Sequence, residues 1–155
     1  IGDDGCYTSK AFKSFARVFK NRFGKEIAKV GGTNHETYLD ICEAILNKDI
    51  GKALTVVDGI EKSGKNMVVV AKDMTICFRN LLVSKTCESA KNMLSFSTEI
   101  FNRYLSLSEK FEINDLMDNM KVFSVIEPEI KYSLSPKTLV ETAIITCISD
   151  DQKKN

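Results

Sequence analysis

The segment Gly59–Asn66 comes closest to a motif that performs chemistry. Its letters, GIEKSGKN, nearly follow the glycine and lysine spacing of a phosphate-binding loop. However, the position that must offer a hydroxyl group to magnesium holds Asn66, and no strand precedes the segment. Such a loop works only when a strand and a helix hold its amide groups around the phosphate. We therefore interpret Gly64 as the end of a helix and predict no nucleotide site.

The single histidine, His35, would have to serve any Ser–His or Cys–His pair. It lies within Thr33–Glu36, which has the spacing of a helix-capping box, so we expect a surface position in a first helical turn. Acidic pairs such as Asp115 and Asp118 lie on polar helix faces. Five cysteines form no CxxC pair, and we expect reduced thiols of a cytoplasmic protein. We expect no catalytic residue, no cofactor and no metal site.

The elements that would position these residues are helices. Only two prolines interrupt the chain, and apolar residues recur at three and four positions, not at alternate ones. The fold class is therefore all-α, a compact bundle of about six helices over residues 33–149. An extra basic amphipathic helix lies in the N-terminal segment 1–32, and a polar tail covers 150–155. We predict helices over about 9–23, 33–47, 49–63, 66–84, 96–111, 113–127 and 135–148.

The length and net charge of the chain limit which classes of function it can have. A chain of 155 residues fits one domain, and a formal net charge of +1 gives no general attraction to nucleic acid or membrane. The most apolar stretch, Met67–Val83, contains charged residues and is too short for a membrane span. The remaining class is a protein that packs against other proteins.

The helix predicted over 66–84 is the main reason to expect protein contacts. Behind its principal apolar face, Val69, Ile76 and Val83 follow one another at intervals of seven. A helix that is apolar nearly all round lies at the centre of its bundle or is covered by another chain. The last predicted helix has a similarly broad apolar face. The apolar residues that we predict at protein interfaces are Val69, Ile76, Val83, Val140, Ile144 and Ile148.

The basic segment 9–23 leaves a second hypothesis open. Phenylalanines recur on one side of this predicted helix, and lysines and arginines occupy the rest of its surface. Such a helix packs its aromatic side on a neighbour, or it binds anionic lipid or nucleic acid. The alternative function is therefore a helical adaptor, or a module that binds nucleic acid or anionic lipid through residues 9–23.

Several polar anchors fall at fixed places along the predicted helices. An Ala-Ile pair at 44–45 precedes Asp49, which opens a helix, and Gly64 ends that helix. The run Phe78–Leu82 reads Phe-Arg-Asn-Leu-Leu and is followed by Lys85, and Ser-Pro at 135–136 opens the last helix. This pattern, over residues 33–149, resembles the C-terminal collar domain, domain three, of the gamma/tau subunit of the bacterial DNA polymerase III clamp loader.

The resemblance implies a non-enzymatic, ring-forming domain that supports sliding-clamp loading in DNA replication. Copies of the subunit would associate through it with one another and with delta- and delta-prime-type subunits. ATP hydrolysis and DNA gripping belong to upstream domains in that family, so we expect neither direct DNA contact nor membrane contact by this fragment. Arg79, Lys85 and Glu141 match polar positions of the family, and we expect structural or inter-subunit ion pairing there.

Overall fold

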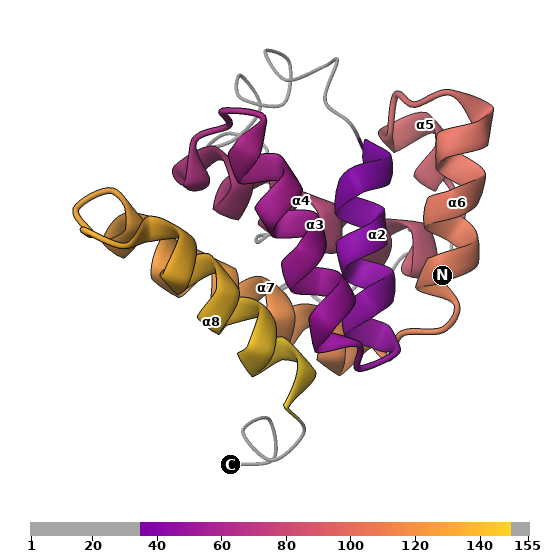
Figure 1. Cartoon of the computed structure of the whole chain (residues 1–155). Coiled ribbons are helices and arrows are strands. Elements are labelled where there is room, and N and C mark those ends of the chain that lie inside the picture. Colours follow the sequence, from indigo (N-terminus) through magenta and orange to yellow (C-terminus); the bar gives the residue numbers. More distant parts are fainter. Residues whose placement is uncertain (1–34, 150–155) are drawn as a thin grey trace.

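A computed structural model of the chain describes residues 35–149, and every regular element within that range is a helix (Figure 1). This confirms the all-α prediction. The predicted basic helix over 9–23, the capping threonine Thr33 and the tail 150–155 lie outside the described residues. The helices are α2 (His35–Leu46), α3 (Ile50–Lys62), α4 (Met67–Thr86), α5 (Ala90–Met93), α6 (Thr98–Ser108), α7 (Ile113–Ile130) and α8 (Pro136–Ile148).

The ends of α3 are set by local signals in the sequence. The Asp49 carboxylate accepts a hydrogen bond of 3.1 Å from the Lys52 amide and so caps the first turn. At the other end, Gly64 has a φ of 91°, which favours glycine over other residues. Its N–H donates to the Glu61 carbonyl, and the Lys65 N–H donates to the Ile60 carbonyl. This turn confirms the interpretation of Gly64 as the end of a helix.

Helix α4 forms the centre of the bundle. It begins at its cap Asn66, whose side chain accepts a 2.7 Å hydrogen bond from the Val68 amide. It packs most extensively against α7 and also against α6, α2 and α8 (Figure 1). Helices of the same chain therefore cover α4 on several sides, which accounts for its second apolar stripe.

The segment between α4 and α7 differs most from the prediction. Helix α5 lies between the helices predicted over 66–84 and 96–111, where no helix was predicted. Phe96 and Phe111 were placed inside one helix, but α6 begins after Ser97, whose hydroxyl accepts a hydrogen bond from the Ile100 amide, and it ends at Ser108. Both phenylalanines match the helical spacing and pack on the core from flanking turns. The capping serine, and not the apolar spacing, therefore decides where α6 begins.

Helices α7 and α8 pair along one side of the bundle. The helix predicted over 113–127 continues through Pro128 and ends at Ile130. A proline this close to the C-terminus removes only one hydrogen bond of the helix. Pro136 stands at the start of α8 as predicted, but the Ser135 side chain makes no capping hydrogen bond. The Ser133 hydroxyl accepts a 2.9 Å hydrogen bond from the Ser135 amide instead.

The cysteines are part of the packing. Cys42, Cys77 and Cys147 are free and buried, as expected for small apolar side chains. Cys87 is disulfide-bonded, so the expectation of reduced thiols throughout is wrong there. Over the described range, no helix has the length and apolar character needed to cross a membrane.

Candidate protein-interaction surfaces

The predicted contact residues do not form one surface. Most of the apolar ones are buried among helices of their own chain: Ile76, Val83, Val140, Ile144 and Ile148. They are core residues of this bundle, and we do not assign an interchain contact to them. The remaining predicted residues are partly exposed: Val69, Arg79, Lys85 and Glu141. Val69 and Lys85 lie near opposite ends of α4, whereas Glu141 belongs to α8.

Arg79 takes part in a buried polar cluster. Its guanidinium donates a 3.1 Å hydrogen bond to the Asn80 side chain, and the Asn80 amide donates to the Tyr104 hydroxyl at 3.4 Å. That hydroxyl also lies 3.0 Å from Nδ1 of His35. The ring of Phe96 stacks on Tyr104 and contacts His35. Arg79 is thus linked by hydrogen bonds to residues of three helices.

Burial controls the ionisation of this cluster. It lowers the pKa of His35 below its usual 6.5 and raises the pKa of Tyr104 well above the usual range. His35 lies in the first turn of α2, as expected, and its side chain is half-buried because its ring packs on Phe96 and Tyr104. The neutral imidazole and the neutral phenol are the favoured forms, which suits a structural cluster.

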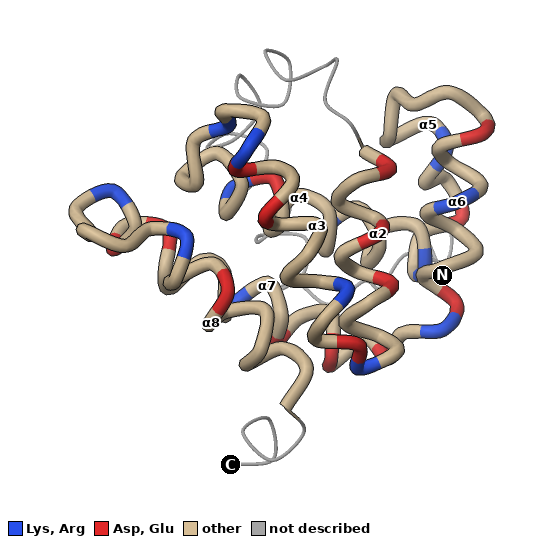
Figure 2. The backbone as a smooth tube through the Cα atoms, in the orientation of Figure 1, with Lys and Arg blue, Asp and Glu red and all other residues tan. Residues whose placement is uncertain are grey.

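A second polar site joins α2 to α6. The Arg103 guanidinium lies 2.5 Å from the Asp40 carboxylate, 3.7 Å from Glu43 and 3.8 Å from Glu36. It also donates to the Glu36 backbone carbonyl. The three carboxylates follow one face of α2 because they are spaced by four and three residues. Figure 2 shows acidic positions along α2, and their partner on α6 holds the two helices together.

A similar arrangement fixes the start of α8 against α3. The Lys137 ammonium lies 2.7 Å from Asp58 and 3.3 Å from Glu61. Lys62 makes a further ion pair with Asp58 at 2.9 Å. Hydrogen bonds from Lys137 and Lys62 lower the pKa of Asp58 to about 2. These contacts orient helices and provide no group for acid–base chemistry at neutral pH.

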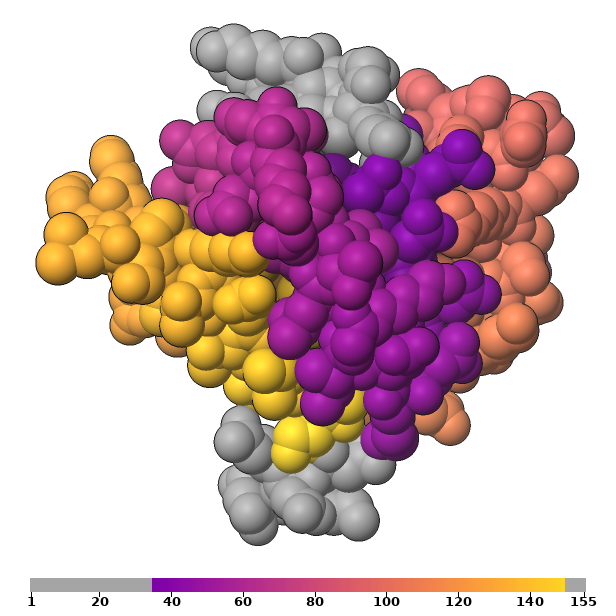
Figure 3. Space-filling model, viewed as in Figure 1, coloured from indigo at the N-terminus to yellow at the C-terminus, as the bar shows by residue number. Residues whose placement is uncertain are grey.

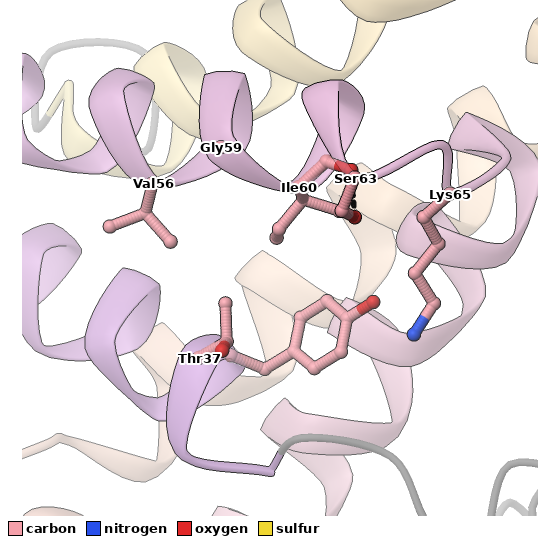
Figure 4. A pocket seen from close by; sticks show the side chains of 7 residues that line it. Thr37, Val56, Gly59, Ile60, Ser63 and Lys65 are labelled. Atoms are coloured by element: carbon pink, nitrogen blue, oxygen red, sulfur yellow. Dashed lines mark hydrogen bonds between the residues drawn. The ribbon is translucent and has the colours of Figure 1, made fainter.

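A cavity of about 360 Å³ lies between α2 and α3. Val56 and Ile60 point into it from α3, Thr37 faces them from α2, and Lys65 borders one side (Figure 4). Tyr38 also lines the cavity; it is only 3% exposed, and burial and the nearby Asp73 carboxylate raise the pKa of its hydroxyl well above the usual range. The Lys65 ammonium lies 3.5 Å from Asp73. We call this cavity the α2–α3 pocket.

Exposed apolar side chains gather at the turn between α7 and α8. Tyr132 and Leu134 are 81% and 101% exposed, and Val125 on α7 is 64% exposed. This turn projects from the body of the molecule at the left of the space-filling view (Figure 3). Sequence reasoning missed it because the residues belong to no helical stripe. The available signal was two large apolar residues in a serine-rich turn before Pro136.

These sites hold helices together and offer apolar side chains for contact. Within residues 35–149 no group of three or more histidine, cysteine or acidic side chains could hold a metal ion. The model of the family described as DNA polymerase III subunits gamma and tau domain III matches residues 27–154. The chain belongs to this family. Domain III of gamma and tau is a non-catalytic helical domain, and the ATPase lies in other domains of those subunits.

Among curated proteins, this domain III chain is similar to DNA polymerase III subunit tau of Bacillus subtilis. The two are 21% identical over 105 residues, which cover 68% of this chain. The matched region spans 18% of the length of that tau subunit. No solved structure matches the chain. The resemblance noted from the Phe78–Leu82 run and the helix caps is thereby confirmed at the level of the family.

Proposed function

We propose that this domain is a non-catalytic assembly module of a bacterial clamp loader, acting in the cytoplasm during DNA replication. The observation that carries the proposal is the match of the gamma and tau domain III family to residues 27–154. In the proposed assembly, the domain associates with further copies of itself and with delta- and delta-prime-type subunits. It contributes binding surface and no chemical step.

Two features of the described residues support a role in assembly. Arg103 and Lys137 make ion pairs that connect helices of the same chain and fix how those helices are oriented. Large apolar side chains remain exposed at the α7–α8 turn. Apolar side chains that are exposed in the single chain are available for burial against a partner.

Of the residues predicted from the sequence, Val69, Lys85 and Glu141 remain candidates for the contact. All three are partly exposed. Glu141 lies one helical turn before Ile145, which is 41% exposed, so α8 offers a charged and an apolar group on neighbouring positions. We assign Lys85 and Glu141 to the polar rim of the interface, where charges set partner choice more than affinity.

The experiment is a mass measurement in dilute solution, by sedimentation or native mass spectrometry, on the full chain alone and mixed with purified clamp-loader subunits. We expect species larger than the 17.4 kDa monomer in at least one of these samples. A strict monomer that also ignores every other subunit would contradict the proposed function.

A further inference from the structure

Helices α2 and α4 bring two thiol groups into contact in the interior of the bundle. Sγ of Cys42 on α2 lies 3.4 Å from Sγ of Cys77 on α4, and the two thiols share a hydrogen bond. The side chains are 0% and 1% exposed, and neither is disulfide-bonded. The proposed function makes no use of this pair.

The two sulfur atoms are close to the separation of a covalent bond. A disulfide holds its sulfurs about 2.0 Å apart, so a closing movement of little more than 1 Å would join Cys42 to Cys77. Cys147 on α8 is a third buried thiol, and its proximity contributes to raising the pKa of Cys42. Two alternative pairings with Cys147 therefore have to be distinguished by experiment.

The folded bundle protects the thiols from reaction. Burial and the hydrogen bond with Cys77 raise the pKa of Cys42 well above its usual range, whereas the thiolate is the form that reacts with oxidants. Oxidation therefore has to begin during a local opening of the bundle that admits water and a small oxidant. Once one sulfur is oxidised, the other is the nearest nucleophile when the bundle closes again.

We propose that Cys42 and Cys77 are a covalent modification site, a dithiol that hydroperoxides convert into a disulfide joining α2 to α4. This inference goes beyond the proposed function and does not depend on it.

The reaction takes two steps. The thiolate of one cysteine attacks a peroxide oxygen, the O–O bond breaks, and the departing hydroxide takes up the proton that the thiol released, which leaves a sulfenic acid and water. The second thiol then attacks the oxidised sulfur, the S–S bond forms, the S–O bond breaks and a second water leaves. The two sulfurs together lose two electrons, and the peroxide gains them.

The disulfide would fasten α2 to the central helix of the bundle. Cys42 and Cys77 are 35 positions apart in the sequence, so the bond closes a long loop and restricts the unfolded chain. The oxidised domain should therefore resist unfolding more than the reduced one.

The test exposes the full chain, purified without reductant, to hydrogen peroxide and then blocks the remaining thiols with iodoacetamide in urea. Trypsin cleaves after lysine and arginine, which places each of the five cysteines on a separate peptide. Mass spectrometry without reduction then shows which cysteines are linked. Cys87 is already disulfide-bonded and does not compete for the oxidant.

Two variants complete the test. Cys42→Ala removes one half of the pair, and Cys147→Ala is the matched control, because its side chain is also about 1% exposed. Far-ultraviolet circular dichroism and the urea midpoint establish that each variant is folded. The peptide map of the unaltered chain decides the pairing by itself if a variant does not fold.

We expect a linked pair of peptides containing Cys42 and Cys77 in the unaltered chain and in Cys147→Ala, and none in Cys42→Ala. The urea midpoint of the oxidised chain should rise by about 1 M or more, and dithiothreitol should return it to its starting value.

Three results would overturn the inference. The first is a linked pair in which Cys147 replaces Cys42 or Cys77. The second is sulfinic acid on either cysteine with no linked pair. The third is a urea midpoint that does not rise on oxidation. None of these results bears on association with clamp-loader subunits, so the proposed function is tested separately.

Discussion

The Tyr104 hydroxyl connects three helices through hydrogen bonds at a point where water has no access. It contacts His35 of α2 and Asn80 of α4 from its own place on α6, and Tyr104 is only 1% exposed. A buried polar group that loses its partner costs more free energy than the bond itself contributes. The stability of the folded state should therefore be sensitive to the loss of a single hydrogen-bonding group from any of these three residues.

Tyr104→Phe tests this dependence. The variant keeps the ring that stacks on Phe96 and removes only the hydroxyl, which leaves the buried Asn80 amide without this acceptor. We expect the free energy of unfolding in urea to fall by about 1–2 kcal/mol. The matched control is Tyr132→Phe at an 81% exposed position, where we expect a change within about 0.5 kcal/mol. Equal effects of the two substitutions would contradict a structural role for the hydroxyl.

His35 should make stability depend on pH. Burial lowers its pKa in the folded state below 6.5, so as the pH falls through 6.5 the unfolded chain takes up a proton before the folded chain does. Nδ1 of His35 can accept a hydrogen bond from the Tyr104 hydroxyl only while Nδ1 carries no proton. This hydrogen bond therefore also favours the neutral imidazole in the folded state. The stability that neutral His35 contributes is fully present above pH 6.5. It is lost as the pH falls from 6.5 to the lower pKa that His35 has in the folded state.

The measurement is the free energy of unfolding in urea between pH 5 and pH 8 for the unaltered chain and His35→Gln. We expect stability to fall below about pH 6.5 in the unaltered chain by no more than about 1.4 kcal/mol per pH unit. The variant, which has no histidine left, should have a flatter profile. Asp58, whose pKa is about 2, affects stability only at much lower pH. Parallel profiles would contradict the assignment.

Among the helices, α6 is short, and ion pairs with α2 fix its orientation. Arg103 holds it to three carboxylates of α2, although those carboxylates are 40–60% exposed and water screens them. For this reason the ion pairs of Arg103 add little to the free energy of unfolding. Their main effect is to fix the orientation of α6 on α2.

We predict that Arg103→Gln lowers the free energy of unfolding by about 0.5–1 kcal/mol at low salt. The remaining carboxylates on α2 then repel one another, and about 1 M salt should remove most of the loss, since the screening length falls to about 3 Å. Lys62→Gln is the control, because its side chain is 75% exposed and makes a single ion pair. A loss that salt leaves unchanged would mean that Arg103 acts through packing and not through charge.

At the scale of the whole molecule, the sequence predicts the all-α class and the six longer helices of the described range, but it misses α5 and does not show what each helix packs against. The predicted cap Asp49 gives the start of α3 correctly because this signal is local. Apolar spacing shows which faces of a helix are apolar, but it cannot distinguish the centre of a bundle from an interface, and Val83 proved to be in the core. The four-residue α5 and the exposed Leu134 have no periodic pattern to predict them.

The central place of α4 leads to a prediction about how the molecule opens. Most of its residues are buried, and α2, α6, α7 and α8 all pack on it, so its backbone hydrogen bonds can break only when the whole bundle unfolds. Helix α5 has one turn and its capping residue Ser89 makes no side-chain hydrogen bond, so it can open alone. In hydrogen–deuterium exchange under native conditions, amides in the middle of α4 should exchange with the free energy of global unfolding.

The same experiment should place the amides of α5 at a much lower free energy of opening, because few buried contacts are lost there. Low concentrations of urea provide the control: exchange in α4 should accelerate with the full denaturant dependence of unfolding, and exchange in α5 should hardly respond. Amides of α4 that exchange as fast as those of α5 would contradict its place at the centre of the bundle. They would indicate that α4 is stable only when another chain covers its apolar surface. Repeating the measurement at concentrations where the chain associates would then reveal added protection along α4.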